Sequence, residues 1–96
     1  MLERDFQRRL INEIKDRFPG SMVLKNDSGY LQGVPDLIVL YGPHWAMLEC
    51  KASEHASVRP NQKHYVDRLN GMSFARFVCP TNKEEVLNDL QQSFQS

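Results

Sequence analysis

The sequence predicts one α/β domain over residues 1–96, with a mixed central sheet and the order helix, strand, strand, strand, helix, strand, helix. Apolar residues recur at helical spacing near both ends of the chain. Short apolar runs, bounded by glycine, proline or polar turn residues, occupy the middle. A further helical segment separates the last of these runs from the others. A helical crossover therefore joins the last two strands and makes the sheet mixed.

The first predicted helix covers residues 2–17, and Pro19-Gly20 ends it. The apolar residues at helical spacing are Leu2, Phe6, Leu10, Ile11, Ile14 and Phe18. A weakly alternating strand is predicted at residues 21–25, and a turn or loop at residues 26–29. These elements lead directly into the most apolar part of the chain.

A hairpin is predicted in the centre of the chain. Residues 35–41 form its first strand, Gly42-Pro43 form the turn, and residues 45–51 form its second strand. Residues 52–59 are polar and have no clear period. We expect them to form a loop that leads into the second helix.

The second predicted helix covers residues 60–70, because its proline fits a first helical turn and Gly71 supplies a C-terminal stop. A strand follows at residues 74–78. Residues 81–84 match the capping box S/T-x-x-E, so the last helix is expected to begin at Asn82. Its buried stripe is predicted to comprise Val86, Leu87, Leu90 and Phe94.

The composition is that of a soluble globular protein, and no apolar run approaches membrane-spanning length. The N-terminus is charged from residue 3 and lacks a signal-peptide apolar region, so a cytoplasmic protein without a membrane partner is expected. Cys50 and Cys79 each sit in an apolar run and are predicted to be buried thiols. No close cysteine–histidine pairing predicts a zinc site.

The formal net charge is zero, but the charges are unevenly distributed. Residues 1–80 hold eleven Lys/Arg and nine Asp/Glu, whereas residues 81–96 hold one and three. If three acids of the first part bind a cation, the body of the domain becomes basic. The charge distribution therefore permits a nucleic-acid partner without requiring one.

Three charged side chains accompany the central hairpin. Glu49 and Lys51 are two residues apart on one strand, so their side chains point to the same face. Asp36 opens the neighbouring strand and can lie beside Glu49 across the sheet. Two carboxylates at that separation repel unless a positive group lies between them. A hard divalent cation with oxygen ligands meets that need, and Lys51 would direct its ammonium group to the same place.

This arrangement suits phosphodiester hydrolysis, which needs an activated water, neutralised phosphate charge and a stabilised leaving oxygen. Lys51 would orient or deprotonate the water, or stabilise charge in the transition state, and the sequence does not choose between these roles. Taken singly, Asp36 reads as a turn acid, and Glu49 and Lys51 as a solvated edge-strand face. The three together favour a catalytic site.

The same residues carry a resemblance to a known family. Pro35-Asp36, followed after thirteen residues by Glu49-Cys50-Lys51, resembles the motif of PD-(D/E)xK nucleases. The flanking stretches LQGVPDLIVL, LECKAS and RPNQ, with Gly71 ahead of a strand, are similar to the VRR-NUC branch, the virus-type replication-repair nucleases found as small stand-alone domains in phages. The resemblance implies a restriction-endonuclease-like αβββαβ core with an added C-terminal helix, and the host cytoplasm if a phage encodes the chain.

The resemblance also implies a metal site that binds Mg²⁺ or Mn²⁺. Asp36 and Glu49 would be its side-chain ligands, and the backbone carbonyl of Cys50 a third ligand. Glu3, on the first helix, would complete the metal shell directly or through water. Dipole complementarity in a first helical turn also accounts for Glu3 alone.

Lys51 would be the catalytic lysine, and Gln62 would lie near the active site on the helix that follows the motif. The catalytic set implied by the resemblance is therefore Asp36, Glu49, Lys51 and Gln62. The residues expected to contact nucleic-acid phosphates are Lys25, Ser28, Arg59, Lys63 and His64. The cations expected to form a solvated face of the first helix are Arg4, Arg8, Arg9, Lys15 and Arg17.

The sequence is thus interpreted as a Mg²⁺- or Mn²⁺-dependent endonuclease that hydrolyses DNA, with branched or Holliday-junction DNA as a candidate substrate. A homodimer would explain both the stability of so small a chain and the cutting of two strands. No small-molecule cofactor is expected. Two alternatives remain open: a non-catalytic nucleic-acid-binding module, and a subunit of a phage or repair complex that retains the nuclease fold.

Overall fold

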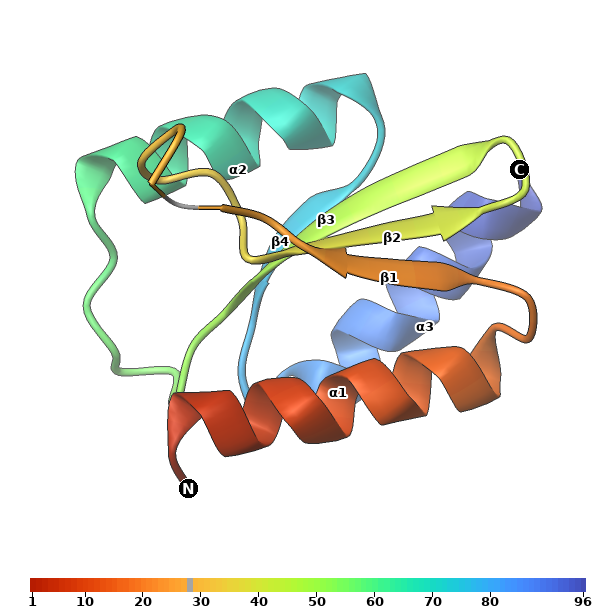
Figure 1. Ribbon diagram of the computed structural model, residues 1–96, viewed down its shortest axis with the longest axis horizontal. Helices are drawn as coiled ribbons and strands as arrows, with labels where there is room; N and C mark the ends of the chain where they lie inside the picture. Colours follow the sequence, from red (N-terminus) through yellow and green to blue (C-terminus); the bar gives the residue numbers. More distant parts are fainter. Residues whose placement is uncertain (28) are drawn as a thin grey trace.

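The computed structural model describes residues 1–27 and 29–96. Its helices are α1 (Glu3–Arg17), α2 (Pro60–Met72) and α3 (Lys83–Gln95). Its strands are β1 (Met22–Lys25), β2 (Leu37–Tyr41), β3 (His44–Cys50) and β4 (Ala75–Val78). The order αβββαβα predicted from the sequence is confirmed (Figure 1). No helix in the described part of the chain is long and apolar enough to span a membrane.

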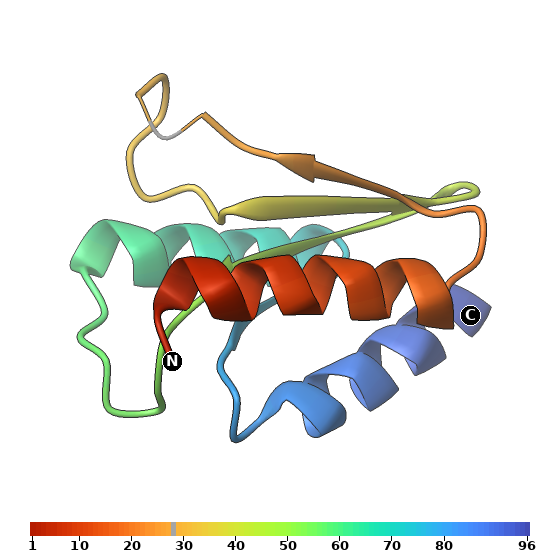
Figure 2. The ribbon, with the colours of Figure 1, turned by 60° about the horizontal axis from the view of Figure 1, so that its bottom comes forward.

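The strands form one mixed sheet in the order β1-β2-β3-β4. β1 and β2 are antiparallel, as are β2 and β3, and the latter pair is the predicted hairpin. β3 and β4 are parallel and are joined through α2, which is the predicted helical crossover. α2 lies on one face of the sheet, and α1 and α3 lie on the other (Figures 1 and 2).

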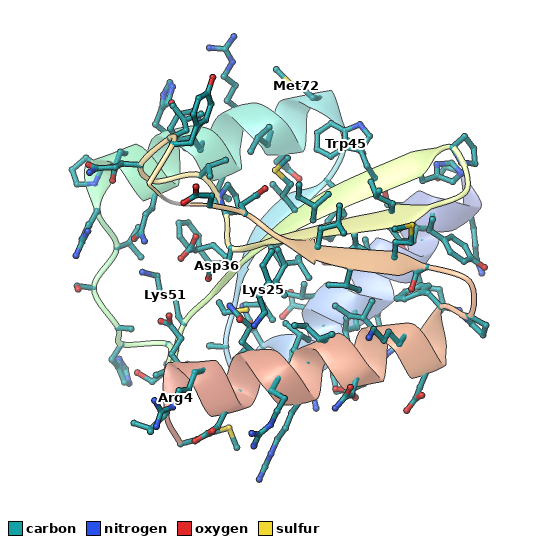
Figure 3. The ribbon with its side chains drawn as sticks, viewed as in Figure 1. Arg4, Lys25, Asp36, Trp45, Lys51 and Met72 are labelled. Carbon is teal, nitrogen blue, oxygen red and sulfur yellow. The ribbon has the colours of Figure 1, made fainter. Side chains whose placement is uncertain are left out.

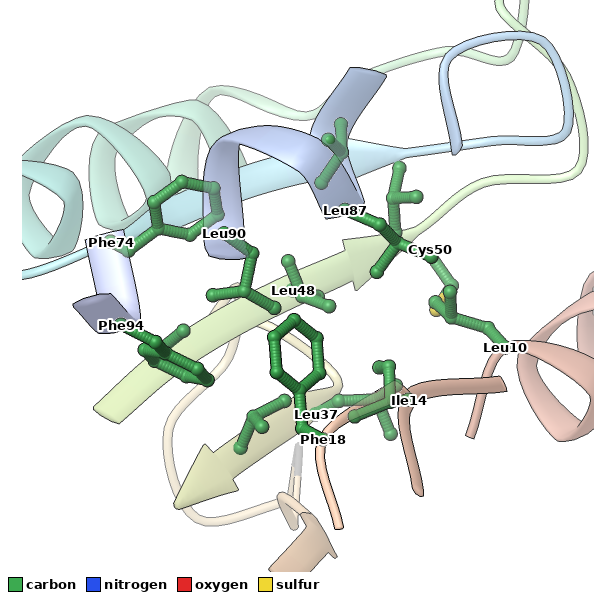
Figure 4. Close-up of a cluster of buried hydrophobic side chains, with 14 of the residues drawn as sticks. Leu10, Ile14, Phe18, Leu37, Leu48, Cys50, Phe74, Leu87, Leu90 and Phe94 are labelled. Carbon is green, nitrogen blue, oxygen red and sulfur yellow. The ribbon is translucent and has the colours of Figure 1, made fainter. Parts of the chain in front are cut away.

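The hydrophobic core fills the space between the sheet and the pair α1 and α3 (Figure 4). α1 contributes Phe6, Leu10 and Ile14, and Phe18 follows directly after the helix. α3 contributes Val86, Leu87, Leu90 and Phe94, which is the stripe that the sequence predicts. The core-facing residues of the hairpin are Leu37, Val39, Ala46, Leu48 and Cys50. Both cysteines are buried and unpaired, as predicted.

Two predicted strand ends differ from the structure in a way that matters for the site. β2 begins at Leu37 and β3 ends at Cys50, so Asp36 and Lys51 lie just outside the strands. The backbone of both residues continues the sheet hydrogen bonding: the Asn26 N–H donates to the Asp36 carbonyl at 2.8 Å, and the Lys51 N–H donates to a β4 carbonyl at 2.8 Å. The sheet therefore fixes both main chains while leaving both side chains at its end.

Two local signals predicted at helix ends, the glycine stop of α2 and the capping box of α3, are wrong. Gly71 does not end α2, because it lies within the helix and lacks the positive φ that a glycine stop requires. The predicted capping box before α3 does not form, since the Thr81 hydroxyl donates to Glu54 and contacts the Cys79 sulfur. Asn82 is the N-cap, but its side chain bonds to the preceding backbone instead of to the helix.

Candidate active site

The two predicted carboxylates lie side by side at one end of the sheet. Leu37 pairs with Leu48 in the antiparallel register, so the next positions outward, Asp36 and Glu49, face each other. The Cys50 backbone N–H donates to Asp36 Oδ2 at 2.9 Å, which holds the Asp36 carboxylate against the end of β3. The alternation of side chains on β3 sends the Cys50 thiol into the core and the Glu49 carboxylate to the opposite face.

The segment before β2 is fixed from two sides. The Asn26 side-chain amide donates to the Pro35 carbonyl at 2.7 Å, which holds the turn that carries Asp36. Gly33 has a φ of +91°, and a Cβ there would lie 2.9 Å from the backbone carbon of Asn61. Glycine is therefore required at this position by both its backbone conformation and its close approach to the first turn of α2.

Lys51 points into the same region from the end of β3. Its ammonium Nζ donates to the Ser57 carbonyl at 3.0 Å and to Gln62 Oε1 at 2.8 Å. The loop of residues 52–59 thus supplies one of the hydrogen-bond acceptors of the lysine. Figure 3 shows Lys51 and Asp36 at the same end of the molecule, between the N-terminal ends of α1 and α2.

Gln62, in the first turn of α2, connects the lysine to the buried carboxylate. Its Oε1 accepts from Lys51 Nζ and from the Arg59 backbone N–H, the latter at 3.1 Å. Its Nε2 donates to Glu49 Oε2 at 3.3 Å. The donors on one side and the acceptor on the other fix the orientation of the amide. Pro60 at the start of α2 supports this position, because proline suits a first helical turn.

Glu49 is the most electrostatically perturbed acid of the site. It is only 4% exposed, and its Oε1 has no hydrogen-bond partner within the described residues. Burial, and then the neighbouring Asp36 carboxylate, raise the pKa of Glu49 from 4.5 to about 8. Lys51 opposes this shift less strongly. Without a further positive charge, the Glu49 carboxyl is therefore largely protonated at neutral pH.

These groups line a hollow of about 440 Å³. Its acidic lining consists of Glu3, Asp36 and Glu49, and its basic lining consists of Lys51 and Arg59. The other lining residues are Gln32, Gly33, Val34, Ser57, Asn61 and Gln62. The hollow is open to solvent, and carboxylate and cationic side chains both line it.

The chemistry of this donor set fits a hard divalent cation. Glu49 Oε1 is a buried carboxylate oxygen without a partner, and Asp36 lies beside it. Such oxygens are the ligands that Mg²⁺ and Mn²⁺ prefer. The described residues contain no group of three or more His, Cys, Asp or Glu side chains placed to hold a metal ion. The protein therefore offers a two-carboxylate site, the number that Mg²⁺ typically takes alongside waters and substrate phosphate.

The two other predicted metal ligands differ in position. Glu3 is exposed and lines the hollow from the first turn of α1, so it borders the carboxylate pair. The Cys50 thiol faces the core, and burial raises the pKa of Cys50 to about 12, so its sulfur is not a thiolate ligand. The backbone carbonyl of Cys50 remains a predicted ligand.

The predicted phosphate contacts do not all gather at the hollow. Arg59 lines it. Lys63 is exposed, and its Nζ lies 2.7 Å from a carboxylate of the same helix. His64 is exposed on α2, and Lys25 lines a separate hollow between α1 and β1. Ser28 lies outside the described residues.

Three contributors to the site carry no role in the sequence prediction. Gly33 and Asn61 lie within the stretches that support the family resemblance, and that position was the only sequence signal for a role of either residue in the site. Ser57 acts through its backbone carbonyl, and no side-chain pattern reveals such a role. The close packing of Gly33 on Asn61 joins the turn before β2 to the helix that carries Gln62.

Comparison with protein families found no family model that matches the chain, and comparison with curated proteins found no matching relative. The functional assignment therefore rests on the residues of the site and on their arrangement. The strongest features are the adjacent Asp36 and Glu49 carboxylates, the lysine beside them, and the amide that joins Glu49 to Lys51.

Proposed function

We propose that this protein is a metal-dependent endonuclease that hydrolyses phosphodiester bonds of DNA. One observation carries the proposal: Asp36, Glu49 and Lys51 meet in one open hollow, and a buried oxygen of Glu49 lacks any partner among the described residues. Buried polar atoms are normally satisfied, so an orphaned carboxylate oxygen beside a second carboxylate favours a bound cation. The lysine and arginine on the hollow's wall suit the negative phosphate of a substrate.

Each residue has a role in this proposal. Asp36 and Glu49 bind the cation, and their main chains are held by the sheet. A bound Mg²⁺ or Mn²⁺ supplies a lowered water pKa and neutralises negative charge on the phosphate. Lys51 places its ammonium group where it stabilises the charge that develops on the phosphate oxygens or orients the attacking water. Gln62 is a positioning residue, since it acts through Glu49 and Lys51.

The PD-(D/E)xK nuclease family, VRR-NUC branch, is part of the proposal. The quoted motif residues support it, and the observed αβββαβ order agrees with that superfamily's core. Branched DNA, including a four-way junction, is a candidate substrate within this proposal.

A homodimer is also part of the proposal, because two copies would cut two strands. α2 covers the β3 and β4 side of one sheet face. On the same face of β1, Met22 and Leu24 are 58% and 41% exposed. A second copy of the chain would cover this apolar surface. Light scattering that gives a monomer mass at micromolar protein would contradict the dimer.

The decisive experiment measures cleavage of supercoiled plasmid and of a synthetic four-way junction. The purified protein is assayed with Mg²⁺, with Mn²⁺ and with EDTA, beside the variants Glu49→Gln and Lys51→Gln. Matched controls are Glu85→Gln and Lys15→Gln, which change the same charges at exposed positions on α3 and α1. Cleavage that requires metal, falls by about 10²-fold or more in the site variants and persists in the controls is the expected result.

Other results would point elsewhere. DNA binding that weakens with salt, without cleavage under any metal condition, would favour the non-catalytic nucleic-acid-binding module. Metal binding without cleavage of either DNA would favour an enzyme or subunit that needs a partner protein. Cleavage unaffected by both site variants would overturn the assignment of the hollow as the active site.

A further inference from the structure

A second hollow, of about 280 Å³, lies between α1 and β1. Its lining residues are Arg4, Asp5, Arg8, Ile11, Asn12 and Lys25. Arg4, Arg8 and Ile11 recur at helical spacing, so one face of α1 forms one wall, and the end of β1 forms the other. Three of the six lining side chains are cationic, which makes this hollow the basic counterpart of the acidic one next to it.

The cations of this hollow are incompletely neutralised. Arg8 lies 3.6 Å from Asp5; the Arg8 side chain is largely exposed and the Asp5 side chain is partly exposed. Arg4 and Lys25 have no carboxylate within 4.0 Å among the described residues. One acid therefore faces three bases, so the hollow carries an excess of positive charge.

The basic hollow borders the candidate active site on both of its walls. Arg4 follows Glu3, which lines the active-site hollow. Lys25 precedes Asn26, whose backbone N–H donates to the Asp36 carbonyl at 2.8 Å. In the sheet register, Lys25 pairs with Leu37, the residue after Asp36. Figure 3 shows Arg4, Asp36 and Lys51 toward one end of the molecule, with Lys25 nearer its middle.

We infer that this second hollow binds a backbone phosphate of the same nucleic-acid strand whose scissile phosphate occupies the active site. Arg4 and Lys25 are its principal ligands, and Arg8 is shared with Asp5. The inference rests on the proposed nuclease function. It reassigns Arg4 and Arg8 from the solvated face that the sequence predicts to a substrate contact. It also assigns Lys25 to a backbone phosphate other than the scissile phosphate beside Lys51.

The test compares two double variants that remove equal charge. Arg4→Gln/Lys25→Gln empties the hollow of its unpaired cations, whereas Arg9→Gln/Lys15→Gln removes two exposed cations of α1 outside the hollow. Each pair is placed in the Glu49→Gln background, and binding to fluorescent DNA is measured by anisotropy from about 50 to 200 mM salt. All four substituted positions are on the surface, so equal melting temperatures verify the folds.

Loss of one phosphate contact lowers the magnitude of the slope of log K against log[salt] by about 0.9. We expect that change, with roughly tenfold weaker binding at the lower salt, only in Arg4→Gln/Lys25→Gln. The same loss in both double variants would overturn the inference, because it would reflect net charge alone. An unchanged slope in Arg4→Gln/Lys25→Gln would overturn it as well.

Two further arms separate this inference from the function on which it rests. Plasmid cleavage by protein that retains Glu49 tests the nuclease function. Cleavage together with an unchanged binding slope would overturn the phosphate contact at the second hollow and would support the nuclease function. Inorganic phosphate is added in a thermal-shift assay without DNA. Stabilisation by phosphate that needs Arg4 and Lys25, with no effect of these residues on DNA binding, would assign the hollow to a free phosphate and overturn the nucleic-acid inference.

Discussion

The Gln62 side chain joins Glu49 to Lys51: its Nε2 donates to Glu49 Oε2 at 3.3 Å, and its Oε1 accepts from Lys51 Nζ at 2.8 Å. This amide connects the buried carboxyl to the ammonium group, and all three residues line the hollow. The same oxygen accepts from the Arg59 backbone N–H, so the start of α2 sets the distance between the two charged groups. The helix therefore orders the site without supplying a charge to it.

The first prediction concerns this positioning role. Gln62→Leu should lower the rate of cleavage by roughly 10- to 100-fold, since both Glu49 and Lys51 lose a hydrogen bond. The acid limb of the pH–rate profile should also move to higher pH, because the charged form of Glu49 loses a donor. Gln95→Leu, at an exposed position on α3, is the control. A lower rate with an unmoved pH profile would indicate only a packing role for Gln62.

The second prediction concerns stability and pH in EDTA. Burial and Asp36 raise the pKa of Glu49 from 4.5 to about 8, so between these values the native state holds a proton that the unfolded state has lost. The free energy of unfolding should therefore fall as pH rises from about 5 to 8, by about 3 kcal/mol at roughly 1.4 kcal/mol per pKa unit. Glu49→Gln should remove this fall.

Urea unfolding at both pH values, for wild type and Glu49→Gln, measures the effect. Glu85→Gln changes an exposed acid and should leave the pH dependence intact. A wild-type protein whose stability rises over this range would show that Glu49 is ionised in the folded state without metal. In that case Lys51 would dominate over burial and Asp36 at this carboxyl.

The fold follows from the sequence more directly than the site does. The stripes of α1 and α3 and the central hairpin are set by hydrophobic periodicity, which is local and strong. The threonine signal failed at Thr81 because a tertiary contact competes with the local cap, and the glycine signal failed at Gly71 because that residue stays within the helix without a positive φ. Helix α2 continues past its glycine, and the threonine hydroxyl bonds to Glu54 and contacts Cys79 instead of the helix.

The carboxylate pair is readable from the sequence because strand alternation and hairpin register place Asp36 opposite Glu49. The hydrogen-bond acceptors of Lys51 are harder to predict from the sequence, since one of them is the backbone carbonyl of Ser57 in an irregular loop. The basic hollow was not predicted because it needs the packing of α1 against β1. Helical spacing alone made Arg4 and Arg8 look like ordinary solvated cations.

The third prediction separates backbone strain from close packing at Gly33. Gly33 and Gly20 have nearly equal φ values of +91° and +90°, but only Gly33 has a neighbour where a Cβ would lie. Gly20→Ala should therefore cost about 1 kcal/mol of stability from backbone conformation alone. Gly33→Ala should cost more, because the new Cβ meets the backbone of Asn61, and it should also slow cleavage by displacing the turn before Asp36 or the start of α2.

Chemical unfolding and plasmid cleavage of the two variants measure these effects side by side. Equal loss of stability in both variants, with normal cleavage, would mean that the segment before β2 moves away from α2 without consequence. The contact between Gly33 and Asn61 would then have no part in ordering the site.

The last prediction separates metal binding from catalysis. At pH 8, Mg²⁺ or Mn²⁺ should raise the melting temperature of wild type, because a cation bound by Asp36 and Glu49 stabilises the folded state. Asp36→Asn should abolish this shift and cleavage together. Lys51→Gln should retain or increase the shift, since it removes a competing positive charge, yet should lose about 10²–10³-fold in cleavage rate. Lys15→Gln, exposed on α1 and outside both hollows, is the charge-matched control and should behave as wild type in both assays. A metal-induced shift that survives Asp36→Asn would place the cation elsewhere in the protein, and a Lys51→Gln variant that cleaves normally would remove the lysine from the reaction.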